Sequence, residues 1–260
     1  MKLGFIGTGR IVTAVVKGFC SSAIKNTTIS LSPRSKSNSI NLARTFPNVT
    51  RLKSNQLVLD NSEVIFIALP AKDSKQILSN LKFNRNHTVI SFIPFLIHSK
   101  LAKLVKPAKR ICRAIPLPTV ESRVCPIPVY NGNSTVMKIL GFIGQPVKVE
   151  DEDQLHTLWV LTGFIASFFD LLKELGSWAK LYGIEEGTAN KYLVNMFHSL
   201  VYSVMKGNQI NLDEIVKKAA TPGGLNEQVV EEIRNKKANK AYATAAVNLL
   251  KRFEDQIQKK

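Results

Sequence analysis

The residues near the start of the chain that are best suited to chemistry are two glycines spaced for phosphate binding. The segment KLGFIGTGRIVTAVVKGF places Gly7 and Gly9 at the first two positions of a G-x-G-x-x-G pattern, and Val12 takes the third. The first glycine makes a tight turn, and the second lets the backbone approach a pyrophosphate at a helix N-terminus. The third serves helix–strand packing, so Val12 changes the packing and need not abolish phosphate binding. We therefore expect a dinucleotide here, the alternative being a glycine turn that holds no ligand.

The end of the next strand-like segment indicates which dinucleotide is preferred. Sites for NAD usually carry an acid about 20 residues after the glycine loop, where it bonds the ribose 2′-hydroxyl. Here the sequence SLSPRSKS offers Ser32, Arg34 and Ser35 and no acid. Hydroxyls and a guanidinium suit a 2′-phosphate, which arginine can bind in a bidentate way. The pattern predicts NADP(H) rather than NAD(H), and a solvated basic loop is the alternative.

The net charge of the chain is confined to its first half. Residues 1–150 carry 22 Lys and Arg against 5 Asp and Glu, whereas residues 151–260 carry 14 of each. A field of this sign would attract a polyanionic ligand such as a nucleotide. A lysine-rich solvated surface is the other interpretation, and no zinc, helix-turn-helix or aromatic-interleaved basic motif favours nucleic acid as a partner.

The elements that must position these residues alternate between strand and helix. Short apolar runs parted by helices of about ten residues indicate parallel βαβ units and an α/β fold. The expected strands are 2–7, 27–32, 49–52, 63–70 and 87–93, and the expected helices are 10–22, 37–46, 55–61, 72–81 and 97–105. Prolines at 116, 118, 126 and 128 mark a change to irregular connections.

From residue 151 the pattern becomes helical, so we expect domains 1–150 and 151–260. The first helical segment, 151–183, contains a run without formal charge from Gln154 to Phe169. A helix that spans a membrane needs about 18 to 20 apolar residues, and this run is shorter. We therefore expect a buried helix and no membrane partner. Further helices are expected over 184–207, 212–220, 221–235 and 239–258.

Several segments together resemble the pyrroline-5-carboxylate reductases, and most closely their divergent, reductase-like relatives. GFIGTGRI is similar to the opening loop of that family, and SNQLVLDNSEVIFIALP to the segment in which an asparagine, here Asn55, precedes a strand and an Ala-Val-Lys-Pro-like turn. RAIPLP resembles an Arg-x-Met-Pro motif through Arg113 and Pro116. ATPGGLNEQV resembles a Ser-Pro-Gly-Gly-Thr-Thr motif and is the most specific match.

The resemblance implies a Rossmann domain followed by a helical domain that forms a homodimer, with each site taking residues from both chains. It implies hydride transfer from NADPH to the C=N bond of a cyclic imino acid, as in proline biosynthesis. The cofactor residues that it and the loop patterns imply are Gly7, Thr8, Gly9, Arg10, Ile11, Ser32, Arg34, Ser35, Asn55, Ala68, Leu69 and Pro70.

The same resemblance implies that the glycine turn of the helical half holds the substrate carboxylate through backbone N–H groups and a hydroxyl. The candidate substrate-binding residues are Gly223, Gly224, Leu225 and Asn226, and the candidate catalytic residues are Thr221 and Asn226. Leu225 replaces the first threonine of the motif, and the Asn226 amide can still donate a hydrogen bond.

Three further departures from the family pattern surround the substrate half. Bulky Trp159 and Leu161 stand where the family has small residues, Pro70 stands where it has lysine, and the segment FIPF follows Ser91 in place of a small Ala-Gly pair. The sequence thus supports the cofactor half better than pyrroline-5-carboxylate itself as substrate.

The remaining reactive side chains show no pattern of their own. Four histidines and three cysteines are scattered without metal or disulfide spacing, which fits a reducing cytoplasm and no metal. Trp159, Trp178 and the pair Phe168 and Phe169 are expected in the core or a dimer interface. Two alternatives to a reductase stay open. The first is a non-catalytic NADP-binding sensor or regulator. The second is a β-hydroxyacid-type dehydrogenase, which would use a lysine–asparagine pair such as Lys191 and Asn195; otherwise these two residues belong to an exposed helix face.

Overall fold

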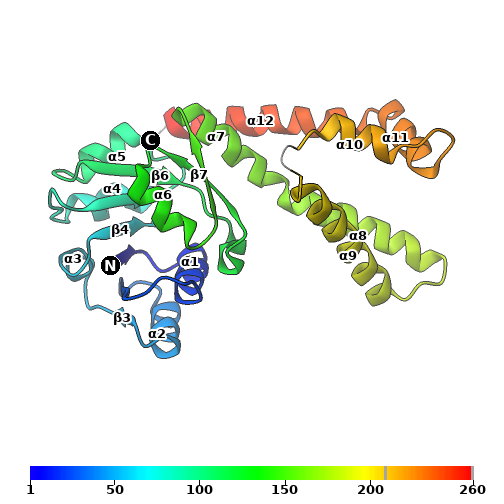
Figure 1. Ribbon diagram of the computed structural model, residues 1–260. Coiled ribbons are helices and arrows are strands. Elements are labelled where there is room, and N and C mark those ends of the chain that lie inside the picture. The colour runs from blue at the N-terminus through cyan, green and yellow to red at the C-terminus, as the bar shows by residue number, and fades with distance from the viewer. Residues whose placement is uncertain (208–209, 259–260) are drawn as a thin grey trace. The chain divides into compact units, whose positions relative to one another are not determined.

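The computed structural model describes residues 1–207 and 210–258, and it confirms an α/β fold with a helical C-terminal region (Figure 1). Eight strands form one sheet in the order β3-β2-β1-β4-β5-β6-β7-β8. All neighbouring strands are parallel except β6 and β7, which are antiparallel. The strand order reverses between β1 and β4, and such a reversal is where doubly wound sheets bind their ligands.

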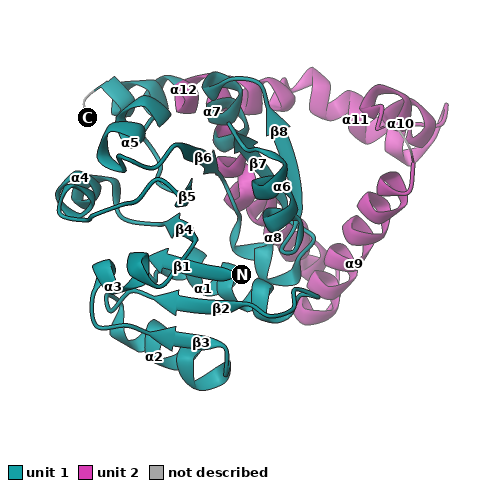
Figure 2. Cartoon of the chain, turned by 60° about the vertical axis from the view of Figure 1, so that its left-hand side comes forward, with its two compact units in different colours: residues 1–159, 251–260 teal, residues 160–250 magenta. Residues whose placement is uncertain are grey.

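The chain forms two compact units, shown in different colours in Figure 2. Unit 1 comprises Met1–Trp159 and Lys251–Lys260, and unit 2 comprises Val160–Leu250. The boundary that the sequence suggests, near residue 150, falls shortly before this division. The sequence pattern also gives no sign that the last ten residues group with the sheet rather than with the helices.

The strands of unit 1 are short, and the central strands β1, β4, β5 and β6 are mostly or fully buried, as expected where helices cover both faces of a sheet. Their bounds are β1 Lys2–Ile6, β2 Thr28–Leu31, β3 Val49–Arg51, β4 Val64–Ile67, β5 Thr88–Ser91, β6 Arg110–Ala114, β7 Pro126–Tyr130 and β8 Gln145–Val149. The helices that connect them are α1 Arg10–Cys20, α2 Lys36–Thr45, α3 Asn55–Asp60, α4 Ala71–Ser79, α5 His98–Leu104, the 3₁₀ helix η1 Pro118–Ser122 and α6 Ser134–Gly141.

Two hydrophobic clusters lie on the two faces of this sheet. On one face α1, α2 and α6 pack through residues such as Val15, Leu42 and Leu140. On the other face α3, α4 and α5 pack through Leu59, Leu78 and Leu101. Val12, at the third position of the glycine pattern, is fully buried in the first cluster, so its side chain serves the packing of α1.

The proline-rich region contains one helix that the sequence reading leaves out. Residues 134–141 form α6, whose N-cap Asn133 accepts a hydrogen bond from the Val136 N–H. Val136, Ile139 and Leu140 are buried at helical spacing. The signal was therefore present as an asparagine cap followed by an apolar i, i+3, i+4 pattern.

Unit 2 consists of helices, as predicted from residue 151 onward. The helical bounds are α7 Glu152–Leu161, η2 Thr162–Phe164, α8 Ile165–Leu181, α9 Glu186–Met205, α10 Leu212–Ala219, α11 Leu225–Asn235 and α12 Ala238–Gln258. Helices α7 and α12 cross the boundary, so that the start of α7 and the end of α12 belong to unit 1.

The expectation of a buried apolar helix is wrong for the single chain. The run Glu152–Leu181 has a mean hydropathy of 1.5 over its most apolar window, of which only 22% is buried. Phe168, Phe169 and Trp178 are 44%, 59% and 60% exposed, so they are not core residues of one chain. By length and composition alone this run could cross a membrane, but core helices of soluble proteins pass the same test.

Candidate functional site

A cleft of about 450 Å³ lies where the strand order reverses, beside the carboxyl ends of β1 and β4. Its lining residues come from the glycine turn, the start of α1, the segments after β2 and β4, and the residue directly after β5. They are Gly7, Thr8, Gly9, Arg10, Ile11, Val12, Arg34, Ser35, Ala68, Leu69, Pro70 and Phe92. This set contains two arginines and no acid, so the described lining is suited to a polyanion.

The two glycines of the turn are required for different reasons. Gly7 has φ +96°, and a Cβ atom there would lie 2.3 Å from the carbonyl oxygen of Ala68. Gly9 has an extended backbone at the N-cap of α1, and nothing lies within 4 Å of the place of its Cβ. The turn is therefore built by Gly7, whereas Gly9 leaves open space at the start of a helix, where a phosphate group fits.

Ser32 stabilises the glycine turn through a buried hydrogen bond and does not line the cleft. Its side chain is fully buried, and its Oγ accepts a hydrogen bond from the Gly7 N–H at 2.9 Å. The Thr8 hydroxyl lies 3.2 Å from both the Oγ and the carbonyl oxygen of Ser32. The placement of Ser32 among the cofactor contacts is thus corrected: its hydroxyl is used inside the protein.

The segment after β2 places Arg34 and Ser35, two of the predicted cofactor residues, at the cleft. Ser35 is the N-cap of α2 and has a left-handed backbone with φ +57°. The Asn38 side chain donates to the carbonyl oxygen of Thr8 at 2.9 Å and so ties α2 to the glycine turn. The guanidinium of Arg34 donates through Nη2 to the carboxylate of Asp73 on α4 at 2.9 Å.

Asn55 is the second predicted cofactor residue that is absent from the cleft lining. It begins α3, after the N-cap Ser54, whose side chain accepts from the Leu57 N–H. Conversely, Val12 and Phe92 line the cleft but were not among the predicted contacts. The position of Phe92 directly after β5 was the available signal, because the carboxyl ends of neighbouring parallel strands meet at one edge of the sheet.

A buried charged cluster lies at the end of β6 in unit 1. Arg113 is 1% exposed, and its Nη1 donates to Glu152 Oε1 at 2.5 Å and lies 2.9 Å from His156 Nε2. Its Nη2 is 3.4 Å from the carbonyl oxygen of Ile93, in the loop after β5. Burial and the neighbouring positive charge of Arg113 lower the pKa of His156. These contacts join the start of α7 to the strand ends beside the cleft.

The glycine turn of unit 2 lies between α10 and α11. Gly223 has φ +72°, and Gly224 is the N-cap of α11. Thr221, Leu225 and Asn226 are exposed, with Leu225 at 83%. The Asn226 amide, for which we predicted a role toward substrate, donates to the carbonyl oxygen of Ala219 at 3.3 Å. Lys191 and Asn195 are both exposed on α9, and the Asn195 amide donates to the Lys191 carbonyl oxygen.

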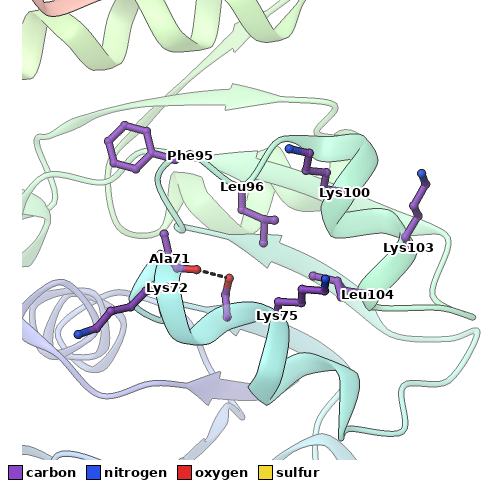
Figure 3. Close-up of a pocket in the computed structure, with 9 residues that line it drawn as sticks. Ala71, Lys72, Lys75, Phe95, Leu96, Lys100, Lys103 and Leu104 are labelled. Atoms are coloured by element: carbon purple, nitrogen blue, oxygen red, sulfur yellow. Dashed lines mark hydrogen bonds between the residues drawn. The ribbon is translucent and has the colours of Figure 1, made fainter. Parts of the chain in front are cut away.

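A second cavity of about 480 Å³ in unit 1 lies between α4 and α5 (Figure 3). Leu96 and Leu104 supply apolar lining, and Lys72, Lys75, Lys100 and Lys103 surround them. In Figure 3 the Lys72 side chain points away from the other three lysines, so the four ammonium groups do not converge. No predicted site residue lines this cavity, and the described residues contain no group of three or more potential metal ligands.

A doubly wound sheet with a G-x-G cleft at its switch point defines a nucleotide-binding fold of Rossmann type. The family model for NADP oxidoreductases, coenzyme F420-dependent, matches residues 2–94, which include the whole cleft lining. The pyrroline-5-carboxylate reductase of Aquifex aeolicus is 26% identical over 196 residues, which is 70% of each chain.

Solved structures resemble the chain over nearly its full length. A pyrroline-5-carboxylate reductase from Coxiella burnetii has a TM-score of 0.84 at 20% identity and covers 98% of this chain and 97% of its own. A Plasmodium falciparum pyrroline carboxylate reductase with NADP bound has a TM-score of 0.83 at 17% identity. The match covers 99% of this chain and 98% of that reductase. The resemblance to the pyrroline-5-carboxylate reductase family that the motifs predicted is thereby confirmed.

Proposed function

We propose that this protein is an NADP-dependent oxidoreductase that transfers a hydride between NADPH and the C=N bond of a small cyclic imine. The observation that carries the proposal is the cleft at the switch point, where the turn at Gly7, the open space at Gly9 and two arginines meet. The cofactor supplies the hydride, and the protein positions it, so a site without an acid–base pair fits this chemistry.

NADP(H) is the proposed cofactor because of the residues that follow β2. Arg34 and Ser35 line the cleft, and no acid stands at the end of that strand to receive a ribose 2′-hydroxyl. The NADP-bound relative from Plasmodium falciparum has the same fold and supports this choice. Exchange of Arg34→Asp should weaken NADPH binding by at least about tenfold and NADH binding much less, because only NADPH presents a 2′-phosphate to the guanidinium.

The substrate half of the proposal rests on the turn Thr221–Asn226 of unit 2. Its exposure in the single chain is compatible with a site completed by a second copy, and we propose a homodimer formed by the C-terminal helices. The exposed apolar side chains of α8 and α9 support that interface, because monomers rarely expose large apolar patches. A dimer of this kind would function in the cytoplasm without a membrane or nucleic-acid partner.

The experiment that tests the proposal is a titration of the purified protein with NADPH and with NADH, followed by addition of pyrroline-5-carboxylate or 1-pyrroline. Nicotinamide absorbance reports turnover. Preferential NADPH binding with oxidation by either imine supports the reductase. NADPH binding without turnover of any imine favours a non-catalytic sensor, which the altered turn at Leu225 would suit. Absence of binding by either nucleotide contradicts the whole proposal.

A further inference from the structure

The turn before α11 already holds a carboxylate of the chain itself. Glu227 lies in the first turn of α11, and its Oε2 accepts a hydrogen bond from the Gly223 N–H at 2.8 Å. Unpaired N–H groups and the partial positive charge at a helix start attract anions. At this helix an internal side chain occupies one of the positions where the carboxylate of a bound substrate would otherwise find a donor.

Two further polar groups of the turn are also engaged, and a third position is apolar. The Gly224 N–H donates to the carbonyl oxygen of Thr221 at 2.9 Å. The Asn226 amide donates to Ala219, and Leu225 has no polar side-chain atom. The backbone N–H groups of Leu225 and Asn226 remain at the helix start, within one helical turn of the Glu227 carboxylate. A second carboxylate bound there would meet a like charge at close range, which reduces affinity by about tenfold at a partly exposed site.

We infer that the substrate of this protein is a cyclic imine that lacks a carboxylate group. The inference rests on the proposed function, because it concerns the substrate that the turn before α11 receives. Glu227 faces the positive charge of the protonated imine, and the exposed side chain of Leu225 offers an apolar surface to its ring. Glu227 is thus the residue that determines specificity: it attracts an iminium cation and repels a carboxylate.

The reaction balances without any further reactant. The iminium carbon accepts a hydride from reduced nicotinamide, and the π electron pair of the C=N bond stays on nitrogen as the lone pair of the amine. The imine nitrogen carries its proton from the start, so Glu227 stays ionised throughout. The products are the cyclic amine and oxidised nicotinamide.

The test compares 1-pyrroline with pyrroline-5-carboxylate in the wild-type protein and in Glu227→Gln. The wild type should reduce 1-pyrroline with a kcat/KM at least about tenfold higher, as expected from the like-charge repulsion. Glu227→Gln keeps the shape and removes the charge, so it should lower kcat/KM for 1-pyrroline and raise it for pyrroline-5-carboxylate. Glu231→Gln, on the exposed surface of the same helix, is the matched control and should change neither.

Binding of the two products provides a readout that does not depend on turnover. Calorimetry of the NADP-loaded protein should show tighter binding of pyrrolidine than of proline, with the order reversed or equalised in Glu227→Gln. Tighter binding of proline to the wild type, or a wild-type preference for pyrroline-5-carboxylate, overturns the inference. Failure of NADPH itself to bind would instead contradict the proposed function, so the two failures are distinguishable.

Discussion

At the scale of single residues, the arginine expected to bind the 2′-phosphate is paired with an acid. Arg34 is half-exposed, and Asp73 accepts its Nη2 hydrogen bond at 2.9 Å. Removing the carboxylate with Asp73→Asn should tighten NADPH binding about three- to tenfold, because one repulsive charge near the phosphate disappears. NADH binding should stay unchanged, and fluorescence titration measures both.

The control for this exchange is Asp60→Asn, which removes an exposed acid at the end of α3. It should leave both affinities as they are. Weaker NADPH binding by Asp73→Asn would show that Asp73 orients Arg34 for the phosphate rather than competing with it.

A second prediction at this scale concerns His156 beside the buried Arg113. Burial and the charge of Arg113 lower the pKa of His156, so the unfolded chain binds a proton more readily than the folded one. Stability is therefore lost as the pH falls below about 6.5, the ordinary histidine value. The slope from one proton cannot exceed about 1.4 kcal/mol per pH unit.

Urea unfolding at pH 7.5, 6.5 and 5.5 measures this dependence. His156→Gln should make the free energy of unfolding fall less steeply with acid, and His198→Gln, on an exposed face of α9, should reproduce the wild-type slope. Part of the slope persists in His156→Gln because burial also lowers the pKa of His87. An unchanged slope in His156→Gln would mean that this imidazole binds protons equally in the folded and the unfolded chain, so that folding does not lower its pKa.

At the scale of elements, we expect the two glycines between β1 and α1 to have different roles: Gly7 is needed for folding, and Gly9 for nucleotide binding. Gly7→Ala should destabilise the protein by several kcal/mol or prevent folding, because the backbone has positive φ and the new Cβ would overlap Ala68. Gly9→Ala meets no atom within 4 Å, so the thermal midpoint should stay near the wild-type value.

The same Gly9→Ala methyl group projects where the pyrophosphate would approach, so NADPH affinity should fall by at least about tenfold. Thermal unfolding and nucleotide titration on both variants test the pair. A Gly9→Ala protein that binds NADPH normally would show that the phosphate does not approach the backbone at this residue.

The sequence predicts the elements of unit 1 well because local signals determine them. Buried strands such as β4 are short apolar runs, and helices such as α1 combine apolar spacing with a glycine at the N-cap. The role of Ser32 could not be predicted in this way. The residue type suggests a phosphate contact, but only the tertiary fold shows that its hydroxyl faces Gly7.

The two contacts that most influence the proposed chemistry differ in how far apart their partners lie in the sequence. Arg34 and Asp73 are 39 positions apart, and no local pattern joins them. The contact between Gly223 and Glu227 spans one helical turn, and an acid after a Gly-Gly turn at a helix start could have indicated it. Hydrophobicity alone also does not distinguish a helix that is buried in the single chain from one that is exposed there, which explains why α8 was expected to be buried.

At the scale of the whole molecule, the exposed apolar surface of unit 2 supports the proposed homodimer. On α9, Leu200, Val201 and Tyr202 are 55%, 58% and 57% exposed, and on α8 Trp178 is 60% exposed. If a second copy covers this surface, Val201→Asp places an unpaired charge in the interface and should weaken association by at least about tenfold. Val124→Asp, at a residue 64% exposed in unit 1, is the matched control and should leave association unchanged.

Sedimentation equilibrium over a range of concentrations distinguishes these outcomes. The wild type and Val124→Asp should sediment at twice the chain mass of 28.9 kDa, whereas Val201→Asp should shift toward the mass of one chain. Because the proposed site takes residues from two chains, imine reduction should fall with the dimer fraction while NADPH binding to unit 1 persists. A wild type that sediments as one chain and still reduces an imine would mean that one copy completes the site alone.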